Sequence, residues 1–527
     1  MSKPVKIIDL FAGPGGLGEG FSAYRPEGKQ AFKIAISIEK EESAHRTLLL
    51  RSLFRQFEHN KVPEAYYAFL RGELGKNPED QLYQLPEIKE PLDNAKHEAQ
   101  KIELGKDNPK DVYKKIRDVI GRDECILIGG PPCQAYSVVG RSRNYGNKTK
   151  EYVATEDHRN FLYLEYLKII SKFQPKIFVM ENVKGILSAK VDGHLIFDSI
   201  RNDLQDPFKT TKVAPENGKE KNKYKIYSLV TKTDGSENPH DFIIRTENYG
   251  LPQARHRVIL LGIREDLAAN LRDFERLQLI ESEPTVRHVI SDLPKLRSRL
   301  SKGIDTVEAW RNSITGISNE TLKQLKYDTH VPKKFYDCFI DQLDSIKESS
   351  ASVGQDRGLE RQHAYNEHLT TELQEWYRDD RLGNYVANHE ARGHIAGDLH
   401  RYLYYSTFAM TMEMSLTSKN LPKALWPNHK NFETGKFADR FRVQRSCSAG
   451  TTITSHISKD GHYFIHYDPS QCRSLTVREA ARIQTFPDNY YFVGTRTQQY
   501  VQVGNAVPPY LAFQIAEIIN NILLKNK

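Results

Sequence analysis

The chain has 527 residues, too many for one compact core, so two or more domains are expected. Charged residues make up 27% of it, no apolar run approaches the length of a membrane-spanning helix, and Met1–Leu10 lacks a secretory signal, so we expect a cytoplasmic protein away from the membrane. The net charge of +8 suits a polyanionic partner but is a weak bias over this length.

The first 40 residues have the pattern of a strand, a glycine-rich turn, a helix and a second strand. The turn GPGGLG begins at Gly13, and the second apolar run ends on Glu39. A G-x-G-x-x-G turn with an acidic residue about 20 positions later is typical of dinucleotide-binding sites. The alternative is that the glycines serve only a tight turn. The pattern predicts a site for an adenosine-bearing cofactor, with NAD and S-adenosylmethionine (SAM) both open.

Further strand-like runs follow at 124–130, 176–182 and 256–263, with helical stretches between them. Such alternation predicts an α/β fold with a doubly wound, mostly parallel sheet. Ligand sites in such sheets lie at the carboxyl ends of the strands.

Two stretches interrupt this alternation. Residues 51–119 are polar and rich in Lys and Glu, which predicts a helical insertion. Residues 265–470 combine charged helical stretches, aromatic segments and a strand-like run. We therefore predict a cofactor-binding domain over 1–264, a separate smaller domain over 265–470, and a segment over 471–527 that returns to the first domain.

The cysteines have no C-x-x-C spacing, so we expect neither a disulfide framework nor a structural zinc site. Cys133 follows two glycines and two prolines at the end of a strand-like run. Pro131 and Pro132 fix the backbone there, and amides at a following helix start would stabilise a thiolate. We predict that Cys133 is a nucleophile, against the alternative of an inert core residue.

Polar side chains also follow the later strand-like runs. Glu181 ends one run, where partial burial would hold it protonated as a general acid; the alternative is a helix cap. Arg255 and Arg257 alternate along an incipient strand, so we expect both guanidinium groups on one face. Such groups suit a carboxylate, a phosphate or a base edge, and a structural salt bridge to Glu181 or Asp9 is the alternative.

The stretch HEARGH, from His389 to His394, is similar to a zinc-binding helix. Its histidines are five residues apart, so they would not share a helical face as histidines four apart do. We therefore predict no metal site.

Six blocks occur in the order FAGPGG, IGGPPCQ, MENVKG, QARHR, REAARIQTFPD and QVGNAVPP. Together they resemble the C5-cytosine DNA methyltransferases of bacterial type. The blocks cover both ends of the chain, and residues 265–450 correspond to that family's variable target-recognition region. The resemblance implies SAM-dependent methylation of cytosine C5 in a specific double-stranded DNA sequence, with the base flipped out of the duplex.

The resemblance also implies catalytic roles. Cys133 matches the thiolate that adds to cytosine C6, and Glu181 matches the residue at N3 and the exocyclic amine. Arg257 matches the arginine at the cytosine carbonyl, and Arg255 matches its supporting partner.

For SAM, the resemblance implies a shared pocket with an aromatic ring on the adenine, backbone contacts, a carboxylate on the ribose and a late asparagine. These are Phe11, then Gly13, Gly15 and Gly16, then Glu39, and Asn505. The family also has an acidic residue near the adenine amine. Asp107 is the candidate, although the insertion blurs the alignment there.

Three alternatives stay open. The tRNA-methylating branch carries Cys-Phe-Thr where this chain reads RSCSAGTT, which argues against it. A dinucleotide-dependent oxidoreductase would leave the later blocks unexplained, and a silent DNA-binding scaffold would not need Cys133. We expect a monomer that acts in restriction-modification or epigenetic marking, in the cytoplasm and on the nucleoid when bound to DNA. A cognate restriction endonuclease that acts on the same site is a possible partner in this interpretation.

Overall fold

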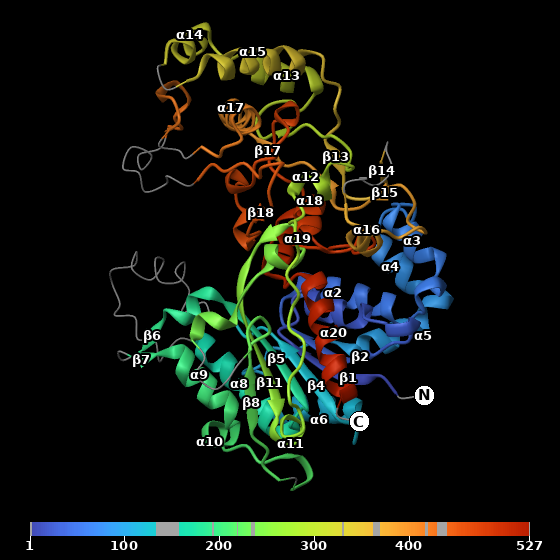
Figure 1. Cartoon of the computed structure of the whole chain (residues 1–527). Helices are drawn as coiled ribbons and strands as arrows, with labels where there is room; N and C mark the ends of the chain where they lie inside the picture. The colour runs from blue at the N-terminus through green and yellow to red at the C-terminus, as the bar shows by residue number, and fades with distance from the viewer. Residues whose placement is uncertain are drawn as a thin grey trace.

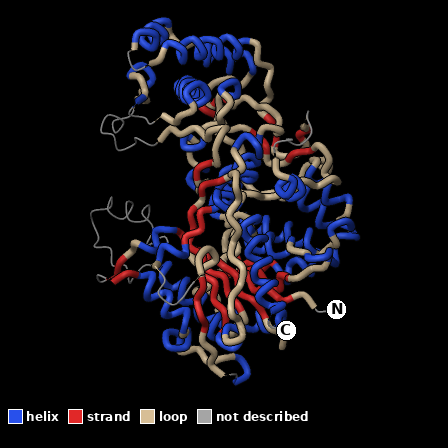
Figure 2. The backbone as a smooth tube through the Cα atoms, viewed as in Figure 1, coloured by secondary structure: helices blue, strands red, loops and turns tan. Residues whose placement is uncertain are grey.

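The chain forms a lower lobe built on a sheet and an upper lobe of helices and loops (Figures 1 and 2). The computed structural model describes residues 3–132, 158–191, 194–218, 220–232, 238–328, 331–361, 369–416, 420–428 and 440–525. Cys133 lies outside these ranges. Within them, no helix is both long and apolar enough to cross a membrane.

The lower lobe contains one eight-stranded sheet in the order β3-β2-β1-β4-β5-β11-β8, with β9 also paired to β11. Pairing is parallel from β3 to β5 and antiparallel around β11. The strands are β1 (Val5–Leu10), β2 (Phe32–Glu39), β3 (Ala99–Lys101), β4 (Cys125–Gly129), β5 (Ile177–Val183), β8 (Tyr224–Tyr227), β9 (Ile243–Arg245) and β11 (His256–Arg264).

Helices cover both faces of this sheet, which is why its strands are apolar on both sides. Successive residues of β4 pack into different cores: Leu127 faces one, while Ile126 and Ile128 face the other. The first core includes α6 (Pro109–Ile120), α8 (His158–Phe173) and α9 (Ile196–Gln205), and the second includes α1 (Gly16–Ala23), α11 (Glu265–Ala268) and α20 (Pro509–Lys525). The short α10 (Pro207–Thr211) packs on α8. The predicted doubly wound α/β fold is confirmed.

The region predicted as an insertion divides into two parts. Its first part is helical and shares a core with Leu382 and Tyr491 of the upper lobe. The helices are α2 (Glu42–Arg55), α3 (Glu64–Leu70), α4 (Pro78–Gln84) and α5 (Pro86–Glu98). The rest belongs to the sheet, because β3 pairs with β2 and α6 packs on the sheet face.

The upper lobe has two apolar cores. One lies at the top around α13 (Val307–Thr315), α14 (Asn319–Tyr327), α15 (Lys333–Lys347) and α17 (Ala396–Met412). The other adjoins the lower lobe around α12 (Val286–Ile290), α16 (Thr371–Tyr377), α18 (Val477–Ile483) and α19 (Arg496–Asn505). Only α20 then crosses to the sheet, where it packs on α1 (Figure 1).

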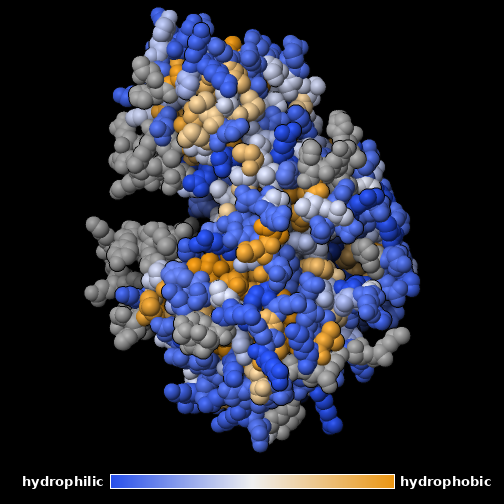
Figure 3. All heavy atoms as spheres, in the orientation of Figure 1, coloured by the Kyte–Doolittle hydropathy of each residue, from blue (hydrophilic) through white to orange (hydrophobic). Residues whose placement is uncertain are grey.

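Two-residue strands join loops outside the sheet. They are β6 (Lys190–Val191), β7 (His194–Leu195), β10 (Gln253–Ala254), β12 (Arg299–Leu300), β13 (Gly354–Gln355), β14 (Leu359–Glu360), β15 (Tyr385–Val386), β16 (His389–Glu390), β17 (Gly393–His394) and β18 (Gly450–Thr451). The pair β10–β18 connects the lobes next to β11. Figure 3 shows that hydrophilic side chains cover most of the visible face of both lobes.

Candidate functional site

The turn after β1 is held from the neighbouring strand β2. Because β1 and β2 are parallel, their carboxyl ends lie side by side, with Leu10 opposite Ile38. The Glu39 carboxylate accepts the backbone N–H of Gly13 on one oxygen at 2.8 Å. Its other oxygen accepts the N–H groups of Lys40 at 2.8 Å and Glu41 at 2.7 Å. Glu39 therefore fixes the turn rather than projecting freely from the strand.

Two glycines make this turn and the start of α1 feasible. Gly15 has φ of 100°, which side chains rarely tolerate. A Cβ on Gly16 would lie 2.2 Å from the carbonyl oxygen of Val507, just before α20. The glycine run thus serves both the turn and the close approach of the C-terminal segment.

A cavity of about 410 Å³ lies at the carboxyl edge of the sheet. Five of the residues predicted to form a site line it: Phe11, Gly13, Glu39, Glu181 and Asn505. Apolar side chains from three neighbouring segments complete the wall, namely Ile38, Ile102, Leu104 and Leu162. Gly130, Pro131 and Pro132 line the same cavity. Cys133, the next residue of the chain, lies outside the described ranges.

Glu181 and Arg257 form an ion pair at this edge. Glu181 lies opposite Ile259 across β5 and β11, so Arg257 is its diagonal neighbour on the same face. The Arg257 Nε lies 2.9 Å from the Glu181 Oε1, and both side chains are only 13% exposed. Burial lowers the pKa of Arg257, and the Glu181 carboxylate opposes that shift. The pair presents an oriented carboxylate to the cavity.

Arg255 has different partners from Arg257. It lies between β10 and β11, where the alternation of a regular strand is interrupted. Its guanidinium donates to the carbonyl oxygens of Ile453, at 2.7 Å, and Gly504, at 3.4 Å. Burial and the Arg257 charge lower the pKa of Arg255 well below its usual range. Arg255 connects the sheet to the upper lobe and does not line the cavity described above.

Asn182 follows Glu181 at the end of its strand, but the sequence reasoning gave it no role in the site. Its side-chain amide donates to the carbonyl oxygen of Pro131 at 3.3 Å, and its Oδ1 accepts the N–H of Val183 at 2.9 Å. The side chain therefore holds the segment that leads into Cys133 against β5. Its position directly after Glu181 in the block MENVKG is the sequence feature from which this role could have been predicted.

The structure does not bring Asp107 to the cavity. Its carboxylate accepts the N–H of Glu103 at 2.7 Å in the turn before α6. Gly15 and Gly16 also lie behind the lining rather than in it. Conversely, Ile102 and Leu104 line the cavity although sequence reasoning counted them in the insertion.

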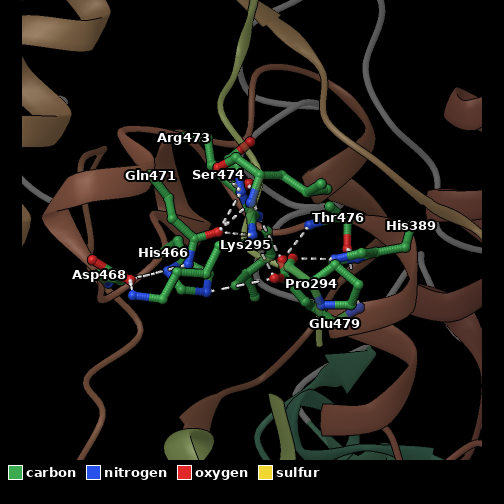
Figure 4. A network of polar contacts seen from close by, with 12 residues as sticks. Pro294, Lys295, His389, His466, Asp468, Gln471, Arg473, Ser474, Thr476 and Glu479 are labelled. Carbon is green, nitrogen blue, oxygen red and sulfur yellow. Dashed lines mark hydrogen bonds and ion pairs between the residues drawn. The ribbon is translucent and has the colours of Figure 1, made fainter. Parts of the chain in front are cut away.

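The two histidines of HEARGH, His389 and His394, form hydrogen bonds to different partners. Both ring nitrogens of His389 have partners, Thr476 Oγ1 at 2.8 Å and the Pro294 oxygen at 2.9 Å (Figure 4). Burial lowers the pKa of His389 to about 4, so the ring is neutral. His394 bonds to Ser474 and Tyr402 instead. Across the described ranges, no cluster of three or more His, Cys, Asp or Glu could hold a metal ion.

The block REAARIQTFPD has a structural role in the same region. Thr476 caps α18 in a reciprocal capping box with Glu479. The Glu479 carboxylate also binds the buried guanidinium of Arg473 (Figure 4). These contacts organise the upper lobe around α18.

The family model of the C-5 cytosine-specific DNA methylases matches residues 94–207 and 238–521. The type II methyltransferase M.Bpa9945I of Bacillus paralicheniformis is 34% identical, over 98% of this chain and 99% of that protein. The chain belongs to the C-5 cytosine-specific DNA methylase family. It is a DNA cytosine-5 methyltransferase, which decides against the oxidoreductase alternative.

More distant relatives agree with this methylase assignment. The type II methyltransferase M.AgeI of Thalassovita gelatinovora is 26% identical over 77% of this chain and 86% of that protein. A solved structure of a prophage-encoded DNA modification methyltransferase from E. coli aligns over 99% of both chains, with a TM-score of 0.51 and 19% identity. That likeness supports the fold.

Proposed function

We propose that the cavity binds SAM and that this methylase modifies a flipped-out cytosine within a specific double-stranded DNA sequence. One observation carries the proposal. A single cavity is lined by the Glu39-held turn, by Glu181, and by Pro131 and Pro132, which lead directly to Cys133. Cofactor and base would therefore meet at one edge of the sheet.

The residues present fit SAM. A volume of about 410 Å³ is within the range of small-molecule sites. Phe11, Ile102 and Leu104 offer an apolar wall for adenine. The Glu39 oxygens have acceptor capacity left for ribose hydroxyls after binding three amides. Asn505 is exposed in the lining from α19.

When bound, SAM supplies an electrophilic methyl group. In our proposal the Cys133 thiolate adds to cytosine C6, and the displaced electron pair makes C5 nucleophilic. C5 would then accept the methyl group, with S-adenosylhomocysteine as the leaving group. Transfer of the C5 proton to water and elimination of the Cys133 thiolate would restore the aromatic ring. Glu181 engages N3 and the exocyclic amine, where it stabilises the charge that develops on the ring. Arg257 orients Glu181 and donates a hydrogen bond to the cytosine carbonyl. Arg255 supports Arg257 from the junction between the lobes.

Cytosine C6 is inaccessible in a stacked duplex, so the base must be flipped at a cost of a few kcal/mol. In our proposal the DNA binds between the lobes near the β10–β18 pair, and the upper lobe reads the sequence. In this proposal the protein acts as a monomer in the cytoplasm and on the nucleoid. Relatives of this chain are named type II methyltransferases, and we propose that a cognate restriction endonuclease acts on the same DNA site.

The test is base-resolution 5-methylcytosine sequencing of a plasmid that carries this gene in a methylation-free host. We expect methylation at one short motif, and none with the Cys133→Ala variant at matched expression. Methylation that persists in Cys133→Ala would exclude the thiol mechanism. Unmethylated DNA from well-expressed wild type would contradict the DNA substrate.

A further inference from the structure

A tyrosine of the upper lobe reaches the glycine-rich turn of the lower lobe. The hydroxyl of Tyr490 donates to the carbonyl oxygen of Pro14, which lines the cavity. A Cβ on Gly15 would lie 3.0 Å from the same hydroxyl, so the contact is close. Tyr490 is fully buried, and burial raises its pKa far above the usual range, which keeps the hydroxyl protonated as a donor.

The turn needs such contacts because its backbone is conformationally costly. Phe11 has a φ of 55°, which side-chain-bearing residues rarely adopt. Gly13 and Gly15, with φ of 57° and 100°, adopt such angles without strain, but glycine loses more conformational freedom than any other residue when a turn is ordered. Glu39 holds the turn from the sheet, at Gly13. Tyr490 holds it from the opposite lobe, at the next residue.

The Tyr490 ring is itself fixed by both lobes. The Arg51 guanidinium of α2 lies 4.8 Å from the ring centroid. The same guanidinium binds the Glu19 carboxylate of α1 and donates to the side chain of Asn489, at 3.0 Å. Phe486 packs on the ring with a centroid distance of 4.8 Å. The hydroxyl therefore approaches Pro14 from a rigid position.

We propose that Tyr490 is a positioning residue for the cofactor: its hydrogen bond to Pro14 holds the glycine-rich turn in the conformation that binds SAM. This inference rests on the proposed binding of SAM in the cavity. A turn without this bond must be ordered when the cofactor binds, which weakens affinity. The chemistry at cytosine, carried out by other residues, is unaffected once the cofactor is bound.

Tyr490→Phe removes only the hydroxyl, and Tyr377→Phe is its matched control. Tyr377 is also fully buried in the same core. Its hydroxyl donates to a backbone carbonyl, that of Arg482 at 2.6 Å, and the Arg482 guanidinium lies 5.6 Å from its ring centroid. Tyr377 does not line the cavity.

The measurements are the Kd of SAM by titration calorimetry and kcat at saturating SAM, for the wild type and both variants. For Tyr490→Phe we expect the Kd to rise about fivefold, the loss of one buried hydrogen bond, with kcat within about twofold of wild type. For Tyr377→Phe we expect a Kd within about twofold of wild type. Its melting temperature should fall as much as that of Tyr490→Phe, because each variant loses one buried hydrogen bond.

Two results would overturn the inference: a Kd of SAM that is unchanged in Tyr490→Phe, whether or not kcat falls, or an equal rise of the Kd in both variants. If the wild type binds SAM and methylates DNA but Tyr490→Phe has the same Kd for SAM, only this inference is refuted. Wild-type protein that binds no SAM refutes the proposed function itself.

Discussion

Replacing Glu39 by Gln tests the cofactor site most directly. The carboxylate accepts three backbone N–H groups, from Gly13 on one oxygen and from Lys40 and Glu41 on the other. Gln has the same shape but only one acceptor oxygen, because its second terminal atom is an NH₂ donor. If the oxygen stays with Lys40 and Glu41, the NH₂ faces the N–H of Gly13, and two donors oppose each other.

The magnitude follows from this exchange. A hydrogen bond to a charged group contributes about 1.5–3 kcal/mol, and the partial exposure of Glu39 favours the lower end. Since about 1.4 kcal/mol changes a dissociation constant tenfold, we expect Glu39→Gln to raise the Kd of SAM about tenfold.

Titration calorimetry with SAM measures this effect. Glu42→Gln is the control, because Glu42 is a neighbouring, exposed carboxylate that pairs with Lys101 and does not line the cavity. We expect the Kd of the control to stay within about twofold of wild type, as exposed pairs contribute little. A Kd for Glu39→Gln that equals that of the control would refute the role given to the Glu39 carboxylate.

Asn182→Ala leaves the Pro131 carbonyl and the Val183 N–H without their side-chain partner, so we expect kcat at saturating SAM to fall about tenfold. Steady-state kinetics check this, and a kcat equal to wild type would contradict it. Burial raises the pKa of Asp9 to about 7 against the opposing charge of Arg55. The folded state therefore binds this proton more tightly than the unfolded state, and the contribution of Asp9 to stability falls as pH rises from about 4 to about 7. Asp9→Asn removes that dependence. Between pH 5 and pH 8, urea unfolding should show the wild type losing about 3 kcal/mol more unfolding free energy than the variant; parallel losses would contradict the assignment.

Local sequence determined much of the lower lobe. Apolar runs that end in polar or glycine residues predict strands whose carboxyl ends meet, because parallel pairing aligns those ends. On this basis Gly13, Glu39 and Glu181 were expected at one edge of the sheet, and the family resemblance added Phe11; all four line one cavity. The prediction for Cys133 stays untested by the described residues.

Only the tertiary structure decided which distant groups meet. Alternation suggested one face for the two arginines, yet Arg257 pairs with Glu181 while Arg255 binds carbonyl oxygens of the upper lobe. Residues 99–119 looked like part of a polar insertion, but β3 pairs with β2 at the edge of the sheet and α6 packs on the sheet face.

The contact between Tyr490 and Pro14 joins residues 476 positions apart in the chain. Periodicity reports only which face of an element is apolar, and it carries no information about the partner that covers that face. The sequence thus determined the strands, the glycine turn and the family's blocks. Packing of the two lobes decided which of their polar groups hold the cavity in shape, because buried donors and acceptors take whichever partner the closed structure brings within hydrogen-bond distance.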